Sequence, residues 1–473
     1  MAPGFFNTVM AGHLSKEDLA GIAVGASIFF PVFGAFMGLV SGLTPVIAQH
    51  YGAHRTLEIR QVVQQSFYWA TILSVLLLIV GVLTVPHLVR ALALEPVVED
   101  ITMEYLSYIA LGLIPVAPAI VLRNFIDAHG RTRLTMYITM TTIPINIVLN
   151  YIFMYGACGV PAFGGPGAGL GAALSYGIFF ILNVIAVLRI PQFARYHVLA
   201  RLPKPIPSDW WALLAICIPI GLTVFCEQSI FGAVGLLMAA YGTTVLAAHQ
   251  AAMNFTTIVY MLPLSVSMAI TILVGYEVGG GRENGARAYI RLSRVLTLVF
   301  VGVIALVLAA MRDSVAALYT TNPEVQELLR VFLLYALVMQ FCDCVNAPLQ
   351  GALRGYKDVT VTFWLAVLSF WGIGLPSGYV LAGWTELGPF GYWVGLNGGI
   401  IVGAVMLMIR LRIIEDKHVY NYPFLMGQGV WLDSEKASPV DSIKEVLKHA
   451  SYSIGFCGLA ECLVALIGKH HGE

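Results

Sequence analysis

Long apolar runs separated by short polar stretches dominate the chain. A helix needs about 20 apolar residues to cross the hydrocarbon core of a bilayer, where its backbone groups must be paired within the segment. Eleven runs are long enough. They predict an all-α polytopic membrane protein with spans near 19–48, 62–86, 102–122, 134–156, 169–188, 210–240, 244–275, 292–311, 326–353, 360–382 and 390–409.

Arginine and lysine lie mainly in alternate loops, and cytoplasmic loops are the ones enriched in them. The opposite loops hold only Lys16, Arg90 and Arg312. We therefore expect a multi-pass protein of the cell inner (plasma) membrane with a cytoplasmic C-terminus. The basic residues expected on the cytoplasmic side are Arg55, Arg60, Arg123, Arg131, Arg133, Arg189, Arg195, Arg201, Lys204, Arg282, Arg287, Arg291, Arg294, Arg354, Lys357, Arg410 and Arg412.

The apolar pattern is incomplete at the start of the chain. An even number of spans would return both ends to the cytoplasm, but residues 1–12 are too short to cross a bilayer. The start resembles the outer end of a helix whose beginning is missing. We therefore expect either that Met1 is not the true start or that the chain is a fragment.

Composition agrees with a membrane protein and excludes several other classes. Of 473 residues, 58% are hydrophobic and 11% are charged, and the mean hydropathy is +0.82. Lys plus Arg equal Asp plus Glu at 26 each, so charge gives no reason to expect a nucleic acid partner. The seven cysteines show neither zinc-site spacing nor disulfide density, so no metal is expected.

An internal repeat of about 227 residues is indicated by matching pairs, against the alternative of chance matches between common apolar residues. The pairs include Leu19 with Leu246, Thr44 with Thr271, and Gly52 with Gly279. Six spans in each half would give both halves one orientation, a parallel repeat of the kind that transporters use to flank a binding site. The expected domains are an N-terminal bundle at 1–190, a linker at 191–208, a C-terminal bundle at 209–412 and a tail at 413–473.

Two acidic residues, Glu227 and Asp343, fall near the centres of predicted spans. An ionised acid at a helix centre costs about 2.5 to 3.5 kcal/mol, so each is expected to face the protein interior and a partner. Neither span offers a central lysine or arginine, which leaves a transported cation or proton as the partner. Two carboxylates in one dry cavity repel each other, and an entering cation relieves that repulsion.

Other central polar residues carry weaker signals. Tyr260 can give a hydroxyl oxygen to the acidic site or be an ordinary buried tyrosine. Gln250, near an outer helix start, can hydrogen-bond a ligand or simply a neighbouring helix. Cys342 and Cys344 flank Asp343, but two thiols without further ligands make a poor metal site.

Several stretches together resemble the multidrug and toxic compound extrusion (MATE) family, in particular its NorM-like branch. They include NTVMAGHLSKEDLAGIAVG, LRNFIDAHGRTRLTMYI, CEQSIF, VLAAHQAAMN and LQGALRGYKD, and they run from about residue 5 to 412. The resemblance implies two six-helix bundles and alternating access. It also implies a cation site at Glu227, Tyr260 and Asp343, and substrate contacts that include Ser27 and Gln250.

The chain departs from the family pattern in its first helix, where Asn7 stands at the place of a typical aspartate. An amide cannot release a proton, so coupling is expected to rest on the second half. Asn7 is kept as a candidate substrate-binding residue. The truncated helix leaves open a non-transporting membrane protein.

The tail differs from the rest of the chain. Residues 413–473 hold 13 charged residues in 61, against 39 in the preceding 412. The tail resembles an internal piece of anaerobic, glycyl-radical ribonucleotide reductase, but about 50 residues cannot supply its barrel and radical site. We expect no enzymatic activity, and either a fusion or assembly artefact or an ordinary amphipathic tail.

The function predicted from these features is a monomeric antiporter, not an enzyme. A coupling ion, Na⁺ or H⁺, enters and amphipathic or cationic drugs leave, with the lipid bilayer as the other partner and no further cofactor. The alternative is a lipid-linked saccharide flippase, which should line its cavity with basic residues to hold pyrophosphate. The central parts of the spans offer none.

Overall fold

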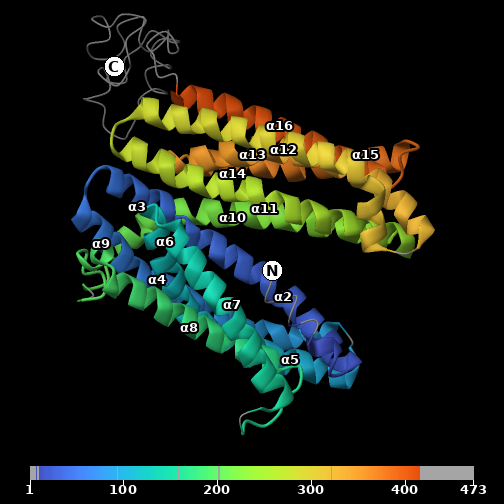
Figure 1. The fold of residues 1–473 in the computed structure, drawn as a ribbon, viewed down its shortest axis with the longest axis horizontal. Coiled ribbons are helices and arrows are strands. Elements are labelled where there is room, and N and C mark those ends of the chain that lie inside the picture. The colour runs from blue at the N-terminus through green and yellow to red at the C-terminus, as the bar shows by residue number, and fades with distance from the viewer. Residues whose placement is uncertain are drawn as a thin grey trace, which may run out of the picture. The chain divides into compact units, whose positions relative to one another are not determined.

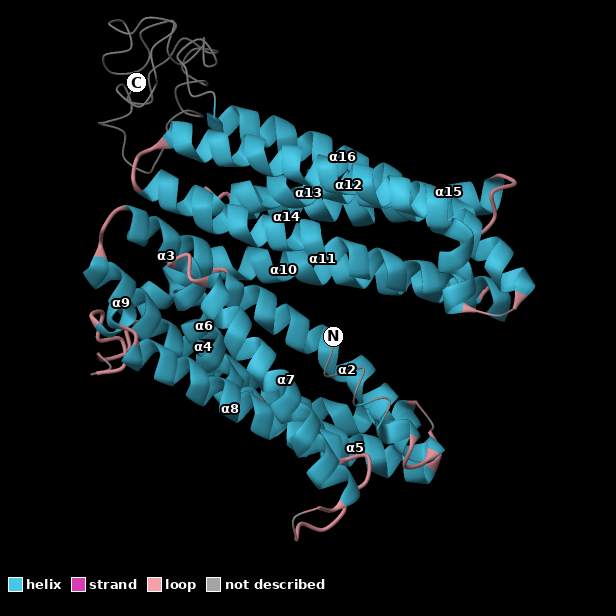
Figure 2. Ribbon diagram, in the orientation of Figure 1, coloured by secondary structure: helices cyan, strands magenta, loops and turns pink. Residues whose placement is uncertain are grey.

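The computed structural model describes residue 7 and residues 10–415, apart from residues 93, 158, 201, 202 and 321 and the side chain of residue 309. The predicted tail therefore lies outside the described residues from position 416 onward. Within the described part, every regular element is helical (Figure 2). Residues 1–405 form one compact unit and the remainder of the chain forms a second. All side chains discussed below belong to the first unit.

The helices follow one another with short connections. The first half contains α2 (Lys16–Ser41), α3 (Leu43–Gly52), α4 (Thr56–Ala91), α5 (Pro96–Leu111), α6 (Leu113–Ala128), α7 (Thr132–Tyr155), α8 (Gly167–Arg189) and the short α9 (Pro191–Ala194). The second half contains α10 (Pro207–Ala239), α11 (Thr243–Gly279), α12 (Glu283–Tyr319), α13 (Pro323–Gly355), α14 (Val359–Val367), the π-helix η1 (Leu368–Gly374), α15 (Leu375–Trp384) and α16 (Phe390–Glu415).

The eleven spans predicted from the sequence are confirmed. Ten helical stretches in the described part of the chain are long and apolar enough to cross a membrane. The eleventh is the pair α5 and α6, bent by 44° at Gly112. The chain is thus a multi-pass membrane protein.

Helix boundaries recur at a fixed interval along the chain. The stretch formed by α2 and α3 runs from Lys16 to Gly52, and α11 runs from Thr243 to Gly279, so both ends are 227 residues apart. The same interval separates the starts of α4 and α12, of α5 and α13, and of α7 and α14. The predicted parallel repeat of two helix bundles is confirmed.

Each half has its own hydrophobic core. Ile120 and Phe125 are among the fully buried residues of the first core, and Phe332 and Trp393 are among those of the second. In the first half α7 packs on α8 and α2 on α5; in the second, α13 packs on α11 and α12 (Figure 1). The halves meet where α2 packs on α10 and α3 on α11.

Local signals fix the starts of the helices that carry the site. The side chain of Asn322 accepts the backbone N–H of Glu324 at 3.0 Å, and Pro323 occupies the first turn of α13, where its missing N–H costs nothing. Pro207 plays the same part at the start of α10, with Asp209 in the first turn. These starts set the register that places Glu227 and Asp343 far from the helix ends.

Candidate cation site

Glu227, Asp343 and Tyr260 come from α10, α13 and α11, and the structure brings them together. The side chain of Asp343 is 9% exposed, and Glu227 and Tyr260 are partly buried. The charges of the two carboxylates interact with each other, and the Tyr260 hydroxyl lies within the field of both. Tyr260 and Asp343 lie on α11 and α13, two helices that pack closely on each other.

Gln350 is a fourth member of the site, which the sequence reasoning missed. Its amide nitrogen Nε2 donates to Glu227 Oε1 at 2.7 Å, and its side chain is only 5% exposed. Gln350 lies seven residues after Asp343, two helical turns along the same face of α13. That spacing from an acid already singled out was the signal available in the sequence.

Arg354 lies one turn beyond Gln350, at the end of α13. Its Nη2 donates to Gln350 Oε1 at 3.4 Å, and its charge interacts with that of Glu227. Among the described residues, no lysine or arginine forms an ion pair with Glu227 or Asp343. Glu227 is therefore stabilised by an amide and by a more distant guanidinium, and oxygen atoms of the acid pair are left for a further positive group.

The site is confined to the second half of the repeat. Moving back 227 residues from Tyr260 and Asp343 leads to Phe33 and Val116, which are both apolar. Val116 is fully packed, at 2% exposure, in the core of the first half. The first half thus has apolar residues at the positions where the second half has Tyr260 and Asp343. The helix packing common to both halves therefore does not require an acid or a hydroxyl there.

Two thiols flank Asp343 on α13. Cys342 and Cys344 are both buried and free. In the described part of the chain, no group of three or more His, Cys, Asp or Glu side chains is arranged to hold a metal ion. The chemistry available at the site is that of carboxylate and hydroxyl oxygens, which suits Na⁺ or a proton.

The three predicted substrate-binding residues lie in different surroundings. Ser27, exposed on α2, donates its hydroxyl to Ala23 O at 2.8 Å. Gln250 is also exposed, near the start of α11 and close to Gly235 of α10. Asn7 is buried, and its Oδ1 accepts from Asn150 Nδ2. Their roles in substrate binding stay predictions.

Asn7 belongs to a buried cluster of neutral polar groups in the first half. Asn150 Nδ2 also contacts Asn146 Oδ1 at 3.1 Å, and Asn146 Nδ2 donates to Ser175 Oγ at 3.0 Å. None of these four side chains carries a titratable carboxyl group. The cluster therefore agrees with the expectation that the first half lacks a proton-releasing group at this place.

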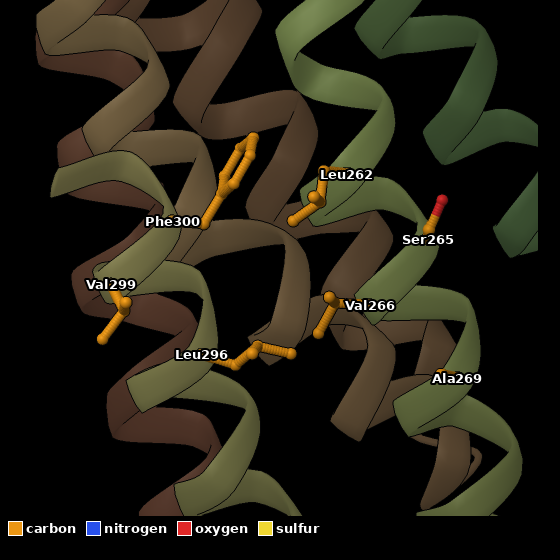
Figure 3. Close-up of a pocket in the computed structure, with 7 residues that line it drawn as sticks. All are labelled: Leu262, Ser265, Val266, Ala269, Leu296, Val299 and Phe300. Carbon is orange, nitrogen blue, oxygen red and sulfur yellow. The ribbon is translucent and has the colours of Figure 1, made fainter. Parts of the chain in front are cut away.

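An apolar pocket of about 440 Å³ lies between α11 and α12 (Figure 3). Its lining residues are Leu262, Ser265, Val266, Ala269, Leu296, Val299 and Phe300. The Ser265 hydroxyl, the one polar side chain in this lining, donates to Met261 O at 2.7 Å. Leu262 follows Tyr260 by two residues, so the two side chains leave α11 in directions about 160° apart. The pocket and the cation site therefore lie on nearly opposite faces of this helix.

Solved structures show the same fold. A eukaryotic MATE transporter, AtDTX14, aligns with a TM-score of 0.77 at 18% identity, covering 86% of this chain and 90% of that chain. The Vibrio cholerae MATE transporter VcmN in its bent form aligns with a TM-score of 0.77 at 20% identity, covering 88% and 94%. The predicted MATE fold is confirmed.

The C-terminal part matches a second family. Residues 392–473 match the model of the anaerobic ribonucleoside-triphosphate reductase family, which agrees with the resemblance found in the tail. The match begins within α16, before the boundary expected at residue 413.

The remaining comparisons concern most of the chain. A probable multidrug resistance protein NorM of Oceanobacillus iheyensis is 44% identical over 416 residues, covering 88% of this chain and 93% of the relative. The protein of the same name in Bacillus subtilis is 43% identical over 417 residues, covering 88% and 92%. The MatE family model matches residues 3–152 and 219–380, one stretch in each half of the repeat. The chain therefore belongs to the MatE family, whose members with solved structures named above are transporters rather than enzymes.

Proposed function

We propose that this protein is a cation-coupled multidrug antiporter, in which Na⁺ or H⁺ enters at Glu227 and Asp343 and an amphipathic or cationic compound leaves. The observation that carries the proposal is the meeting of these two acids with Tyr260, at mid-length of three spans in one half of the repeat. The relatives named as probable multidrug resistance proteins support the class of substrate.

The acidic pair gives the coupling ion a physical role. Two carboxylates that share a poorly hydrated site repel each other, and a bound cation or proton removes that repulsion. One positive charge moving down a membrane potential of 100 mV releases about 2.3 kcal/mol. This free energy sustains roughly a 50-fold gradient of a neutral substrate when one cation enters per cycle.

The repeat supplies the moving parts. Two bundles of the same orientation can rock about the site between them, which is how many transporters expose a site alternately to each side of the membrane. The acid pair lies in the second bundle, so we propose that ion binding there changes how α10, α11 and α13 pack, and thereby favours one of the two arrangements.

The charge of the site favours a cationic substrate or ion over an anionic one. Arg354, whose charge acts on Glu227, is engaged with Gln350 at the end of α13. A pyrophosphate group would need several basic residues facing it at mid-membrane. We therefore propose drug export rather than movement of lipid-linked saccharides.

We propose that the protein lies in the plasma membrane, and the distribution of Lys and Arg supports an orientation with the C-terminus in the cytoplasm. The protein is proposed to act as a monomer, since the paired bundles of one chain supply both sides of the pathway. Its partners are small-molecule drugs and the lipid bilayer.

Drug accumulation in efflux-deficient cells tests the proposal. Cells that express this chain are compared with cells that express Glu227→Gln or Asp343→Asn, with external sodium varied at fixed pH and pH varied without sodium. We expect lower accumulation that needs both acids and that rises when the coupling cation is withdrawn. Equal accumulation in all cells, despite matched membrane expression, would remove the proposal.

A further inference from the structure

Gln350 is held at both ends of its side-chain amide. Nε2 donates to Glu227 Oε1 at 2.7 Å, and Oε1 accepts from Arg354 Nη2 at 3.4 Å. The side chain is 5% exposed, so water has little access to it. The amide therefore bridges a carboxylate on α10 and a guanidinium on α13.

The chemistry of the two neighbours permits only one orientation of this amide. A carboxylate can only accept hydrogen bonds when it is ionised, and a guanidinium can only donate them. The NH₂ group must therefore face Glu227, and the carbonyl oxygen must face Arg354. In a flipped amide, the NH₂ group would face the guanidinium of Arg354, which is also a donor. The carbonyl oxygen would face the carboxylate of Glu227, which is also an acceptor.

This orientation places positively polarised hydrogens on an oxygen of the proposed cation site. A cation that approaches Glu227 Oε1 meets the N–H of Gln350 in the same region and is repelled by it. We infer that Gln350 competes with the transported cation for Glu227, and so weakens cation binding enough for the cation to be released. The inference rests on the proposed function, because it assigns a role within the same site.

Release matters for a carrier because an ion that binds too tightly cannot leave the site and stops the cycle. A buried carboxylate pair without a donor would hold a cation strongly, since the low dielectric of the site strengthens the attraction. The Gln350 amide compensates the Glu227 charge in part while no cation is on Oε1. It is a positioning and competing group rather than a cation ligand.

The chain offers a matched control on the same helix. Gln340 is also on α13 and fully buried, and its Nε2 donates to the backbone oxygen Thr256 O on α11 at 2.9 Å. It has the same residue type and a hydrogen bond of similar length, but its partner is not part of the cation site. Replacing it tests what the loss of a buried glutamine on α13 does by packing alone.

The experiment compares Gln350→Met, Gln350→Glu and Gln340→Met with the unaltered chain in membrane vesicles. Drug efflux is measured against sodium concentration at fixed pH, and against pH without sodium. The variants are then compared in their response to the cation that drives efflux by the unaltered chain. Gln350→Glu keeps the shape of the side chain, so it serves if Gln350→Met does not reach the membrane.

Both Gln350 variants are expected to lower the half-saturating cation concentration and to lower the maximal rate. For Gln350→Met the expected shift is about tenfold, which corresponds to ~1.4 kcal/mol. Gln340→Met is expected to leave the half-saturating concentration unchanged. An unchanged or raised value in the Gln350 variants, or an equal shift in Gln340→Met, would overturn the inference. Efflux by the unaltered chain that depends on no cation would instead remove the proposed function, and the inference with it.

Discussion

Gly52 of α3 and Gly279 of α11, which correspond in the repeat, pack against each other's helices in a reciprocal contact. A Cβ atom on Gly52 would overlap the carbonyl oxygen of Tyr276, and a Cβ atom on Gly279 would overlap that of Gln49. Gln49 and Tyr276 are themselves 227 residues apart. Each of the two contacts is therefore the counterpart of the other in the repeat. The two halves thus meet at these helix ends through a pseudo-twofold contact between backbones.

The first prediction follows from this contact. Gly52→Ala and Gly279→Ala should each push α3 and α11 apart, because backbone atoms cannot yield as side chains do. We expect several-fold slower drug efflux from each variant, and faster thiol labelling of a cysteine introduced at Gln49. Gly81→Ala on α4 is the control, since nothing lies within 4 Å of its added Cβ. Efflux at the unaltered rate in both variants would show that the close contact is not needed.

The second prediction concerns the acidic pair as one unit. If Glu227 and Asp343 bind one cation together, either single neutralisation should already abolish cation dependence. The double variant Glu227→Gln with Asp343→Asn should then be no worse than either single variant. Cation-dependent efflux rates of the unaltered chain, the two single variants and the double variant form a double-mutant cycle. Losses that simply multiply would indicate two independent sites.

The third prediction isolates the hydroxyl of Tyr260. Tyr260→Phe removes the oxygen and keeps the ring, so the half-saturating cation concentration should rise several-fold while the KM for drug stays nearly constant. Tyr151→Phe, at an exposed position on α7, serves as the control. A changed drug KM with an unchanged cation response would assign Tyr260 to the substrate rather than to the ion.

The fourth prediction concerns pH and His129, which follows the end of α6. Burial, together with the charge of Arg195, lowers the pKa of His129 to about 4, against the effect of its hydrogen bond to Phe125 O. Nδ1 lies 2.7 Å from that carbonyl oxygen, so Nδ1 carries the proton of the neutral ring. Nε2 is buried without a partner among the described residues, which leaves an added proton there without an acceptor.

The direction in which stability changes with pH follows from the protons that the folded and unfolded chains bind. Between pH 6.5 and about 4 the unfolded chain binds a proton at this histidine that the folded chain does not, so stability falls as pH falls through this range. The contribution is at most about 3 kcal/mol. Thermal unfolding of the solubilised protein at pH 7 and pH 5 should show a smaller loss for His129→Gln than for the unaltered chain. Equal losses would show that other groups carry the pH dependence.

The sequence predicted the spans well because length and apolarity determine them, but it missed features that depend on packing. The run at 62–86 is helical from Thr56 to Ala91, because polar turns extend the helix beyond its apolar part. Prolines indicate both irregular places, since Pro115 lies three residues after the bend at Gly112 and Pro376 two residues after the π-helix Leu368–Gly374, but they predict neither the bend angle nor the π-helical turn.

The candidate site was predictable only in part. The acids stood out because charge is rare at mid-span, whereas Tyr260 gained its role from the family resemblance. Gln340 and Gln350 look alike in the sequence, yet one donates to a backbone oxygen of α11 and the other to Glu227 on α10. Such a difference depends on how three helices are rotated against one another, which single-chain patterns do not determine.

Transport by purified protein in proteoliposomes shows whether a cation gradient drives drug export through Glu227. A fluorescent organic cation is followed while only a sodium gradient, only a proton gradient or no gradient is imposed, for the unaltered chain and for Glu227→Gln. We expect dye movement against the inward flow of one of these cations in the unaltered chain, and none in the variant. Dye movement without any cation gradient, or equal movement in Glu227→Gln, would contradict it.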